Sequence, residues 1–300
     1  MDLKPIKIPE HYNYVAAFLT LACNLRCSYC INRFGSEGFE KKHLTGEEWV
    51  RGLNRIISRD DLPLTLQGGE PSLHKDFIYI INNLRPDLHI DLLTNLQFDI
   101  ERFIREVNPK RLKRDAPYAS IRVSYHPEQM ELDPLVRKVL RMQEAGFSVG
   151  IWGVLHPSQD SIIRDAQEKC LKLGIDFRFK EFLGEYNGTM YGTFKYEGAC
   201  DQKFEEKVLC KTTELIMGCG GGVYKCHSDL YEGREPVGNI IDPAFELEDI
   251  YRICDVYGRC NPCDIKVKTN RFQQFGHTSV DIKEIPGGFK VKSHYETSNS

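Results

Sequence analysis

The sequence predicts an α/β fold built on parallel strands, and two observations support that prediction. Between Tyr14 and about Phe182, six short apolar segments alternate with segments whose apolar residues recur at helical spacing. Strands separated by helices pair in parallel through right-handed crossovers. From the residues alone, the sheet is either open and doubly wound or closed into a complete or partial barrel. The strands are expected at 15–21, 64–67, 90–94, 120–125, 149–155 and 175–182.

Start and stop signals mark the helices between these strands. The first helix opens at a capping box, Thr45-Gly-Glu-Glu48, and its apolar pattern runs on to Ile57. Gly146 and Gly174 follow the last two helices and predict where they end. After the helix that begins at Thr45, the others are expected at 74–84, 99–107, 133–145 and 158–173.

The pattern changes after about residue 184, where glycine, cysteine and tyrosine become frequent. Met217-Gly-Cys-Gly-Gly-Gly222 suits only a tight loop. This second unit has too few apolar residues for a core of its own, so it needs an additional cross-link to be stable. We therefore divide the chain into a core at 1–185, a cysteine-rich domain at 186–270 and a loosely ordered extension at 271–300.

Composition excludes several classes of protein. A net charge of −3 provides no general attraction for nucleic acid, and the basic run at 110–114 is interpreted as a solvated face. No apolar stretch approaches the roughly 20 residues that cross a bilayer. The N-terminus has no apolar signal-peptide core. A cytoplasmic protein without a membrane partner is expected.

Eleven cysteines in a chain of this kind indicate metal ligation rather than disulfides. Three of them, Cys23, Cys27 and Cys30, directly follow the first strand, where parallel α/β folds place their sites. Three thiolates hold an iron–sulfur cubane and leave its fourth iron open for a small molecule. Structural zinc, which usually takes four ligands, is the alternative.

The spacing Cys23-x3-Cys27-x-Tyr29-Cys30 resembles the signature of the radical S-adenosylmethionine (SAM) superfamily. Gln67-Gly68-Gly69-Glu70-Pro71 resembles its GGE motif, which receives the SAM amino group. Thr94 and Asn95, after the third strand, match the family's contacts to the methionyl and ribosyl parts. Tyr29 is expected near the adenine. The resemblance therefore implies SAM contacts from Tyr29, Gln67, Gly68, Gly69, Glu70, Thr94 and Asn95.

This resemblance covers roughly residues 14–185 and implies a partial (β/α)6 barrel of the TIM type. It also implies a mechanism. The SAM amino and carboxylate groups bind the open iron of a [4Fe-4S] cluster, and one electron splits the sulfonium. The resulting 5′-deoxyadenosyl radical abstracts a hydrogen atom from the substrate. An electron donor such as flavodoxin or ferredoxin is expected as a partner.

The later cysteines resemble the family's auxiliary-cluster domains, named SPASM and, in a shorter form, twitch. Cys210, Gly221 and Cys226 match the opening of these domains, and Cys260 and Cys263 follow. No further cysteine is present for a full SPASM domain. The resemblance thus implies a twitch-like domain with one auxiliary [4Fe-4S] cluster held by Cys210, Cys226, Cys260 and Cys263.

Three other cysteines leave that ligand set open. Cys219 and Cys254 are able to exchange places with the chosen ligands, and Cys200 is interpreted as a buried apolar residue. A zinc site of four cysteines is the alternative to the auxiliary cluster.

Strand alternation predicts which side chains face the interior. Ser124 and Val154 are expected beside SAM, with Val154 near the adenine edge. His126, Arg178 and Lys180 are expected to act on the substrate. With Arg122, the inward cations exceed what one SAM carboxylate needs, so an anionic substrate is expected. Ion pairs with Asp91, Asp176 or Glu181 are the alternative.

Two reactions remain open at this stage. The first is a two-electron oxidation of a small polar molecule such as an amino sugar, an aminocyclitol or a nucleotide-linked sugar. The second is modification or epimerisation of a ribosomal peptide or a protein side chain. Peptide-modifying members often carry an N-terminal domain that grips the leader peptide, and the first strand near residue 14 leaves no space for one. A small-molecule substrate is therefore preferred, with a non-catalytic metal-binding protein as a third class.

Overall fold

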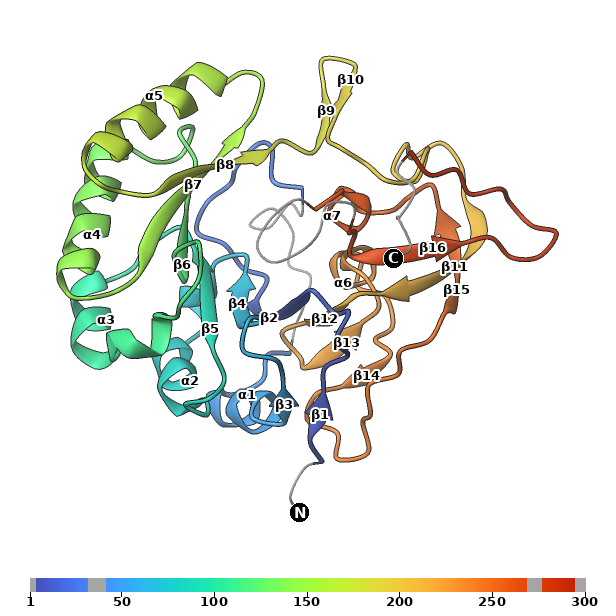
Figure 1. The fold of residues 1–300 in the computed structure, drawn as a ribbon, viewed down its shortest axis with the longest axis horizontal. Helices are drawn as coiled ribbons and strands as arrows, with labels where there is room; N and C mark the ends of the chain where they lie inside the picture. The colour runs from blue at the N-terminus through green and yellow to red at the C-terminus, as the bar shows by residue number, and fades with distance from the viewer. Residues whose placement is uncertain (1–3, 32–41, 269–276, 295–300) are drawn as a thin grey trace.

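The computed structural model describes residues 4–31, 42–268 and 277–294 (Figure 1). Its main sheet has the strand order β14-β13-β12-β2-β4-β5-β6-β7-β8. The six strands from β2 to β8 run parallel in sequence order, which confirms the predicted α/β arrangement. They are β2 (Tyr14–Thr20), β4 (Leu64–Gly68), β5 (Ile90–Thr94), β6 (Ile121–Tyr125), β7 (Val149–Leu155) and β8 (Phe177–Glu181).

Helices between these strands cover the outer face of the parallel sheet, on the left of Figure 1. They bury their apolar faces in one continuous core with the strands, as amphipathic helices do. Two 3-10 turns, Pro71–Leu73 and Pro109–Leu112, complete the connections. The helices are α1 (Gly46–Leu53), α2 (Phe77–Asn83), α3 (Ile100–Glu106), α4 (Leu132–Glu144) and α5 (Asp160–Lys172).

The predicted helix signals are present, with one correction. At the start of α1, the backbone N–H of Glu48 donates to Oγ1 of Thr45 at 3.2 Å, and that of Thr45 donates to Oε2 of Glu48 at 2.8 Å. The helical pattern expected up to Ile57 stops at Leu53. Residues 56–57 instead form the short strand β3, paired in parallel with β1 (Ile6–Lys7), which buries Ile56 and exposes Ile57.

The segment after β8 begins with a hairpin, and its later strands then form one new sheet and extend the main sheet. A three-stranded antiparallel sheet has the order β15-β11-β16, and three other strands extend the main sheet. Short helices α6 and α7 lie between the two sheets in Figure 1. The elements are β9 (Gly184–Tyr186), β10 (Thr189–Tyr191), β11 (Glu206–Thr212), β12 (Glu214–Met217), β13 (Gly222–Tyr224), α6 (His227–Tyr231), β14 (Gly238–Asn239), β15 (Arg252–Tyr257), α7 (Pro262–Ile265) and β16 (Val280–Lys283).

The main sheet crosses the domain boundary expected at residue 185. Strand β12 pairs in parallel with β2 from Glu214 to Met217, and Leu215 and Met217 pack into the same core as the parallel strands. A separate apolar cluster forms around Val208, Tyr257 and Ile265. The cysteine-rich region therefore has a small core of its own and also completes one edge of the main sheet.

The expectation that residues 271–300 are loosely ordered is wrong for β16. That strand pairs with β11 over four residues and buries Val280 and Ile282. Their alternation with exposed or half-buried neighbours is what one face of a sheet requires. Further on, the backbone N–H of His294 donates to the carbonyl oxygen of Lys195 at 2.9 Å. Residues 269–276 and 295–300 lie outside the described ranges.

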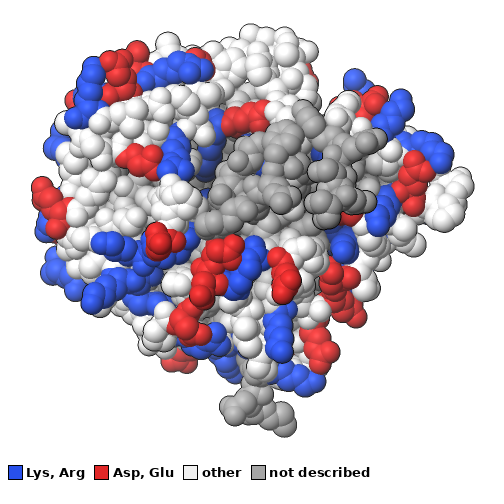
Figure 2. Space-filling view, in the orientation of Figure 1, with Lys and Arg blue, Asp and Glu red and all other residues white. Residues whose placement is uncertain are grey.

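Charges of both signs are mixed on the face of the molecule drawn in Figure 2. On the face drawn in Figure 2, Lys and Arg side chains alternate with Asp and Glu, and no broad area of one sign is visible. This agrees with the small net charge of −3. Within the described residues, no helix is both long and apolar enough to cross a bilayer.

Candidate active site

A cavity of about 360 Å³ lies at the carboxyl ends of the parallel strands, and we call it the central cavity. It brings together segments that are far apart in the sequence, as parallel α/β folds do at this edge. Nearly every predicted site residue of the first 185 positions lines it. They are Cys23, Cys27, Tyr29, Cys30, Gln67, Gly68, Gly69, Glu70, Thr94, Asn95, Ser124, His126, Val154 and Lys180.

The three cysteines of the first group are half-buried at one side of this cavity. Burial raises the pKa of Cys27 to about 12, so its thiol stays protonated until a metal replaces the proton. The loop is tied to the segment after β6, because Ser28 donates to Glu128 from its backbone at 2.5 Å and from its hydroxyl at 2.7 Å. Three thiols beside an open cavity fit a cluster with one free iron. The link to Glu128 had no signal in the sequence.

Glu70 is buried at the cavity wall and is held by donors from two strand ends. Its Oε1 accepts from the hydroxyls of Ser72 and Thr94, each at 2.7 Å, and from the Ser72 backbone at 3.2 Å. Its Oε2 accepts from the Asn95 backbone at 2.7 Å. Burial raises the pKa of Glu70 against these donors. A carboxylate has about four acceptor positions, so Oε2 is the atom with capacity for an ammonium group.

Glu70→Gln is expected to weaken SAM binding without removing iron. The substitution keeps the shape of the side chain but loses the charge that favours an ammonium group, at a cost on the order of 2 kcal/mol. SAM affinity of the reconstituted protein and its iron content measure the two effects. Glu101→Gln, on the exposed face of α3, is the control. Unchanged SAM affinity would remove Glu70 from the site.

Gly68 and Gly69 are required by the close approach of two backbones. A Cβ atom at Gly68 would lie 2.1 Å from the carbonyl oxygen of Thr20, and one at Gly69 would lie 2.3 Å from that of Ala22. The approach is fixed by hydrogen bonds from Gly69 to Thr20 at 2.9 Å and from Glu70 to Ala22 at 2.8 Å. These glycines therefore join the end of β4 to the start of the cysteine loop.

Aromatic side chains form one wall of the central cavity. The Tyr29 hydroxyl lies 2.9 Å from Nδ1 of His126, and the Tyr29 ring stacks on His156 with centroids 5.2 Å apart. The Phe182 and His156 rings meet edge to face, with centroids 4.5 Å apart. Burial, together with nearby Lys180, lowers the pKa of His126 to about 4, so this imidazole is neutral near pH 7. The stacking of His156 on Tyr29 had no signal in the sequence.

A second cavity of about 530 Å³, the side cavity, shares part of its wall with the central one. The side chains common to both are Lys180, Glu181, Phe182 and Lys266. Trp152 also lines the side cavity.

The placement of Arg178 corrects its expected position beside the other site residues. It lines the side cavity and not the central one, and it forms an ion pair with Asp176 at 2.8 Å. Arg122 likewise pairs with buried Asp91 at 3.4 Å. The alternative of ion pairs therefore holds for both arginines. For Arg122 and Asp91 the cause is burial, because a charge leaving water needs a partner, whereas the Arg178–Asp176 pair is partly exposed.

The second group of cysteines is arranged differently from the expected ligand set. Cys210, Cys226, Cys254 and Cys260 line one small cavity between the sheet β15-β11-β16 and helix α6, and we call them the four-thiol group. A hydrogen bond from Cys210 lowers the pKa of Cys254. Cys263 instead lines the central cavity.

In the described part of the chain, no three His, Cys, Asp or Glu side chains lie close enough together to hold a single metal ion. An iron–sulfur cluster takes one thiolate at each iron, so its ligands stand further apart. Cys200 and Cys219, the remaining cysteines of this region, are buried and line neither cavity.

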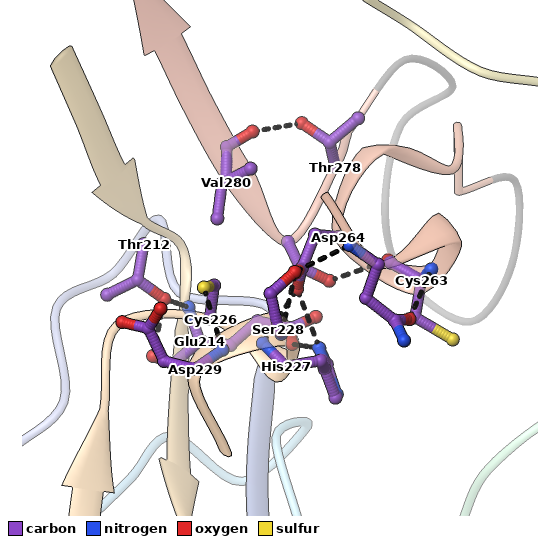
Figure 3. A network of polar contacts seen from close by, with 12 residues as sticks. Thr212, Glu214, Cys226, His227, Ser228, Asp229, Cys263, Asp264, Thr278 and Val280 are labelled. Carbon is purple, nitrogen blue, oxygen red and sulfur yellow. Dashed lines mark hydrogen bonds and ion pairs between the residues drawn. The ribbon is translucent and has the colours of Figure 1, made fainter. Parts of the chain in front are cut away.

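Asp264 links the region of the four-thiol group to the central cavity (Figure 3). Its Oδ1 accepts from the backbone and the ring of His227 at 2.8 and 3.0 Å, and its Oδ2 accepts from the backbone and hydroxyl of Ser228 at 3.0 and 2.9 Å. Although burial opposes ionisation, these donors hold the pKa of Asp264 below its usual value. The network fixes α6 against α7, which carry Cys226 and Cys263 at their beginnings.

Comparison with known proteins identifies relatives of this chain. Residues 18–156 match the model of the radical SAM superfamily. GTP 3′,8-cyclase from Nautilia profundicola is 28% identical over 186 residues, which are 59% of this chain and 58% of that protein. GTP 3′,8-cyclase from Sulfurovum is 26% identical over 239 residues, which are 77% of this chain and 72% of that protein. The alignment therefore spans less than two thirds of the first of these relatives.

Solved structures show the same fold at low identity. A histidine-tagged form of anSMEcpe with bound AdoMet aligns with a TM-score of 0.51 and 14% identity, covering 79% of this chain and 78% of that one. SuiB from Streptococcus suis aligns with a TM-score of 0.50 and 14% identity, covering 79% and 64%. These structures show a likeness of fold alone. The match at residues 18–156 identifies that part of the chain as a radical SAM superfamily domain, whose cofactors are a [4Fe-4S] cluster and SAM.

Proposed function

We propose that this chain is a radical SAM enzyme that oxidises a small anionic molecule by two electrons. The observation that supports it most directly is the pair of adjoining cavities. The central cavity contains the cysteine loop and the GGE segment, and it meets the side cavity at Lys180, Glu181, Phe182 and Lys266. In a partial (β/α)6 barrel, the arrangement we propose for β2 to β8, both cavities open at the strand ends.

Each part of the central cavity has a distinct role in this proposal. Cys23, Cys27 and Cys30 hold the cluster, and Oε2 of Glu70 receives the SAM amino group. Tyr29, fixed between His126 and His156, provides the flat wall for the adenine. When bound, the cluster and SAM supply a 5′-deoxyadenosyl radical, which removes a hydrogen atom from the substrate. A flavodoxin or ferredoxin is the proposed electron donor.

The side cavity contains the side chains that would bind the substrate. The guanidinium of Arg178 lies 5.9 Å from the centre of the Trp152 ring, and Lys180 and Lys266 stand where the two cavities meet. An aromatic face beside cations suits a ring joined to phosphate. The relatives are named GTP 3′,8-cyclase, and that name refers to a nucleotide. We therefore favour a nucleotide-linked or phosphorylated sugar among the small polar substrates.

Lys180→Met is expected to weaken substrate binding under this proposal. Loss of a hydrogen bond to a charged group costs about 1.5–3 kcal/mol, so the KM of an anionic substrate rises by roughly ten- to a hundredfold. Formation of 5′-deoxyadenosine above the level without substrate is measured with UDP-glucose, GTP, glucosamine and an aminocyclitol. Lys172→Met, on the exposed face of α5, is the control.

Two outcomes would contradict the proposed substrate class. One is a KM for the preferred compound that Lys180→Met leaves unchanged. The other is stimulation by the aminocyclitol, which carries no anionic group, or by a peptide. Stimulation by GTP with a cyclised product, rather than an oxidised one, would replace the dehydrogenation by the reaction for which the relatives are named.

A further inference from the structure

The pairing of β11 with β15 places Cys254 beside Cys210. Cys210 lies opposite Arg252 in this antiparallel pair. Cys254, two residues further along β15, therefore projects from the same face of the sheet as Cys210, and diagonal neighbours of this kind are within contact distance. Both side chains line the same small cavity. Cys226 and Cys260 face the same small cavity and complete the four-thiol group.

Helix α7 turns Cys263 away from that group. Neighbouring residues of a helix project about 100° apart, so Cys263 and Asp264 cannot face the same side. Asp264 is fixed toward α6 by its hydrogen bonds with His227 and Ser228. Figure 3 shows the sulfur of Cys263 pointing away from this network, with the sulfur of Cys226 on the other side of Asp264. Cys263 lines the central cavity together with Cys30 and Lys180.

We infer that the second iron–sulfur cluster is held by Cys210, Cys226, Cys254 and Cys260, and that Cys263 is a free thiol of the central cavity. The inference rests on the proposed function only for the use of that cluster in electron transfer. In this ligand set Cys254 takes the place of Cys263, which the spacing Cys260-x2-Cys263 favours as a ligand. Four thiolates leave no iron open to substrate, which limits this cluster to electron transfer or a structural role.

The surroundings of the four-thiol group suit this role. Four thiolates give the cluster site a net negative charge, and Lys225 and Arg234 line the cavity as cations. Both contact Asp229, at 3.4 and 3.1 Å, which holds them beside the thiols. The space between the thiols is about 20 Å³, room for roughly one water molecule. Loading a cluster therefore requires the thiols to rotate outward.

Iron content separates the two ligand sets without any turnover. With Cys23, Cys27 and Cys30 replaced by alanine, the anaerobically reconstituted chain should hold about four irons, as one cluster. Adding Cys254→Ala should reduce iron below about one per chain, because the cluster loses a ligand. Adding Cys263→Ala should leave iron and the electron paramagnetic resonance spectrum of the reduced cluster unchanged. Cys200→Ala, a buried cysteine of the same apolar cluster, is the matched control.

Thiol labelling of the unsubstituted, cluster-loaded protein gives a second measurement that does not depend on how a variant folds. Iodoacetamide should label Cys263, with SAM slowing the reaction, and should leave the four-thiol group unlabelled. The inference is overturned if Cys263→Ala loses the cluster, if Cys254→Ala keeps it, or if Cys254 is labelled and Cys263 is protected. Absence of an oxidised product would contradict the proposed reaction alone, because neither measurement uses substrate.

Discussion

Replacing Cys23, Cys27 and Cys30 with alanine is expected to abolish reductive cleavage of SAM and to lower iron from about eight to about four per chain. Among the described residues that line the central cavity, Cys263 is the one other cysteine, and one thiol cannot hold a cubane. The second cluster should persist, because the four-thiol group belongs to a separate apolar cluster around β11 and β15. Iron assay and 5′-deoxyadenosine formation with dithionite measure both effects.

Cys170→Ala is the control for this triple substitution. Cys170 is a buried residue of α5 and lines neither the central cavity nor the four-thiol cavity. Its removal should lower stability, by the loss of a small apolar group, but not iron content. Loss of all iron from the triple variant would contradict two independent cluster sites. Zinc bound in stoichiometric amount by the native protein would contradict the cofactor assignment itself.

Removing two thiols that belong to both the expected and the inferred ligand set of the second cluster should uncouple SAM cleavage from substrate oxidation. Cys210 and Cys260 are common to both sets, so Cys210→Ala with Cys260→Ala does not depend on the assignment of Cys254. A substrate radical next to oxygen or nitrogen is a strong reductant, and it needs an acceptor for its electron within the protein. Without the second cluster, 5′-deoxyadenosine should still form while the oxidised product disappears.

The intact enzyme sets the reference for that comparison. It should consume one SAM for each oxidised product and should incorporate no deuterium from heavy water at the reacting carbon. Epimerisation by a cysteine thiol is the rival, and the position of Cys263 in the central cavity makes it the thiol to test. Solvent deuterium in a product of unchanged oxidation state, lost in Cys263→Ala, would reject the dehydrogenase proposal.

Local signals in the sequence were sufficient for most of the parallel sheet and for the wall of the central cavity. The capping box at Thr45 and the glycines after α4 and α5 act through their immediate neighbours. Parallel strands connected in sequence order also end at one edge, so Glu70 and Thr94 had to lie close together. They are in fact joined by a hydrogen bond of 2.7 Å.

Long-range pairing decided what local pattern could not. No local signal marks β12 as a neighbour of β2, because the pairing joins Glu214 to Tyr14, about two hundred positions apart in the chain. The expected extension after residue 271 likewise contains β16, which is held by β11. Arg178 faces inward as alternation predicts, but Asp176 and the wall of the side cavity determine which space it lines.

The cysteines show the same division most clearly. Cys23, Cys27 and Cys30 lie within one loop, so their spacing alone brings three thiols to the end of the first strand. Cys210, Cys226, Cys254 and Cys260 come from separate segments, and their spacing in the chain does not set their distance in space. The β11–β15 register places Cys254 beside Cys210. The rotation of α7, fixed by the hydrogen bonds of Asp264, places Cys263 in the wall of the central cavity. Spacing determines a site only where a short loop limits the reach of the chain; elsewhere strand register and helix rotation determine it.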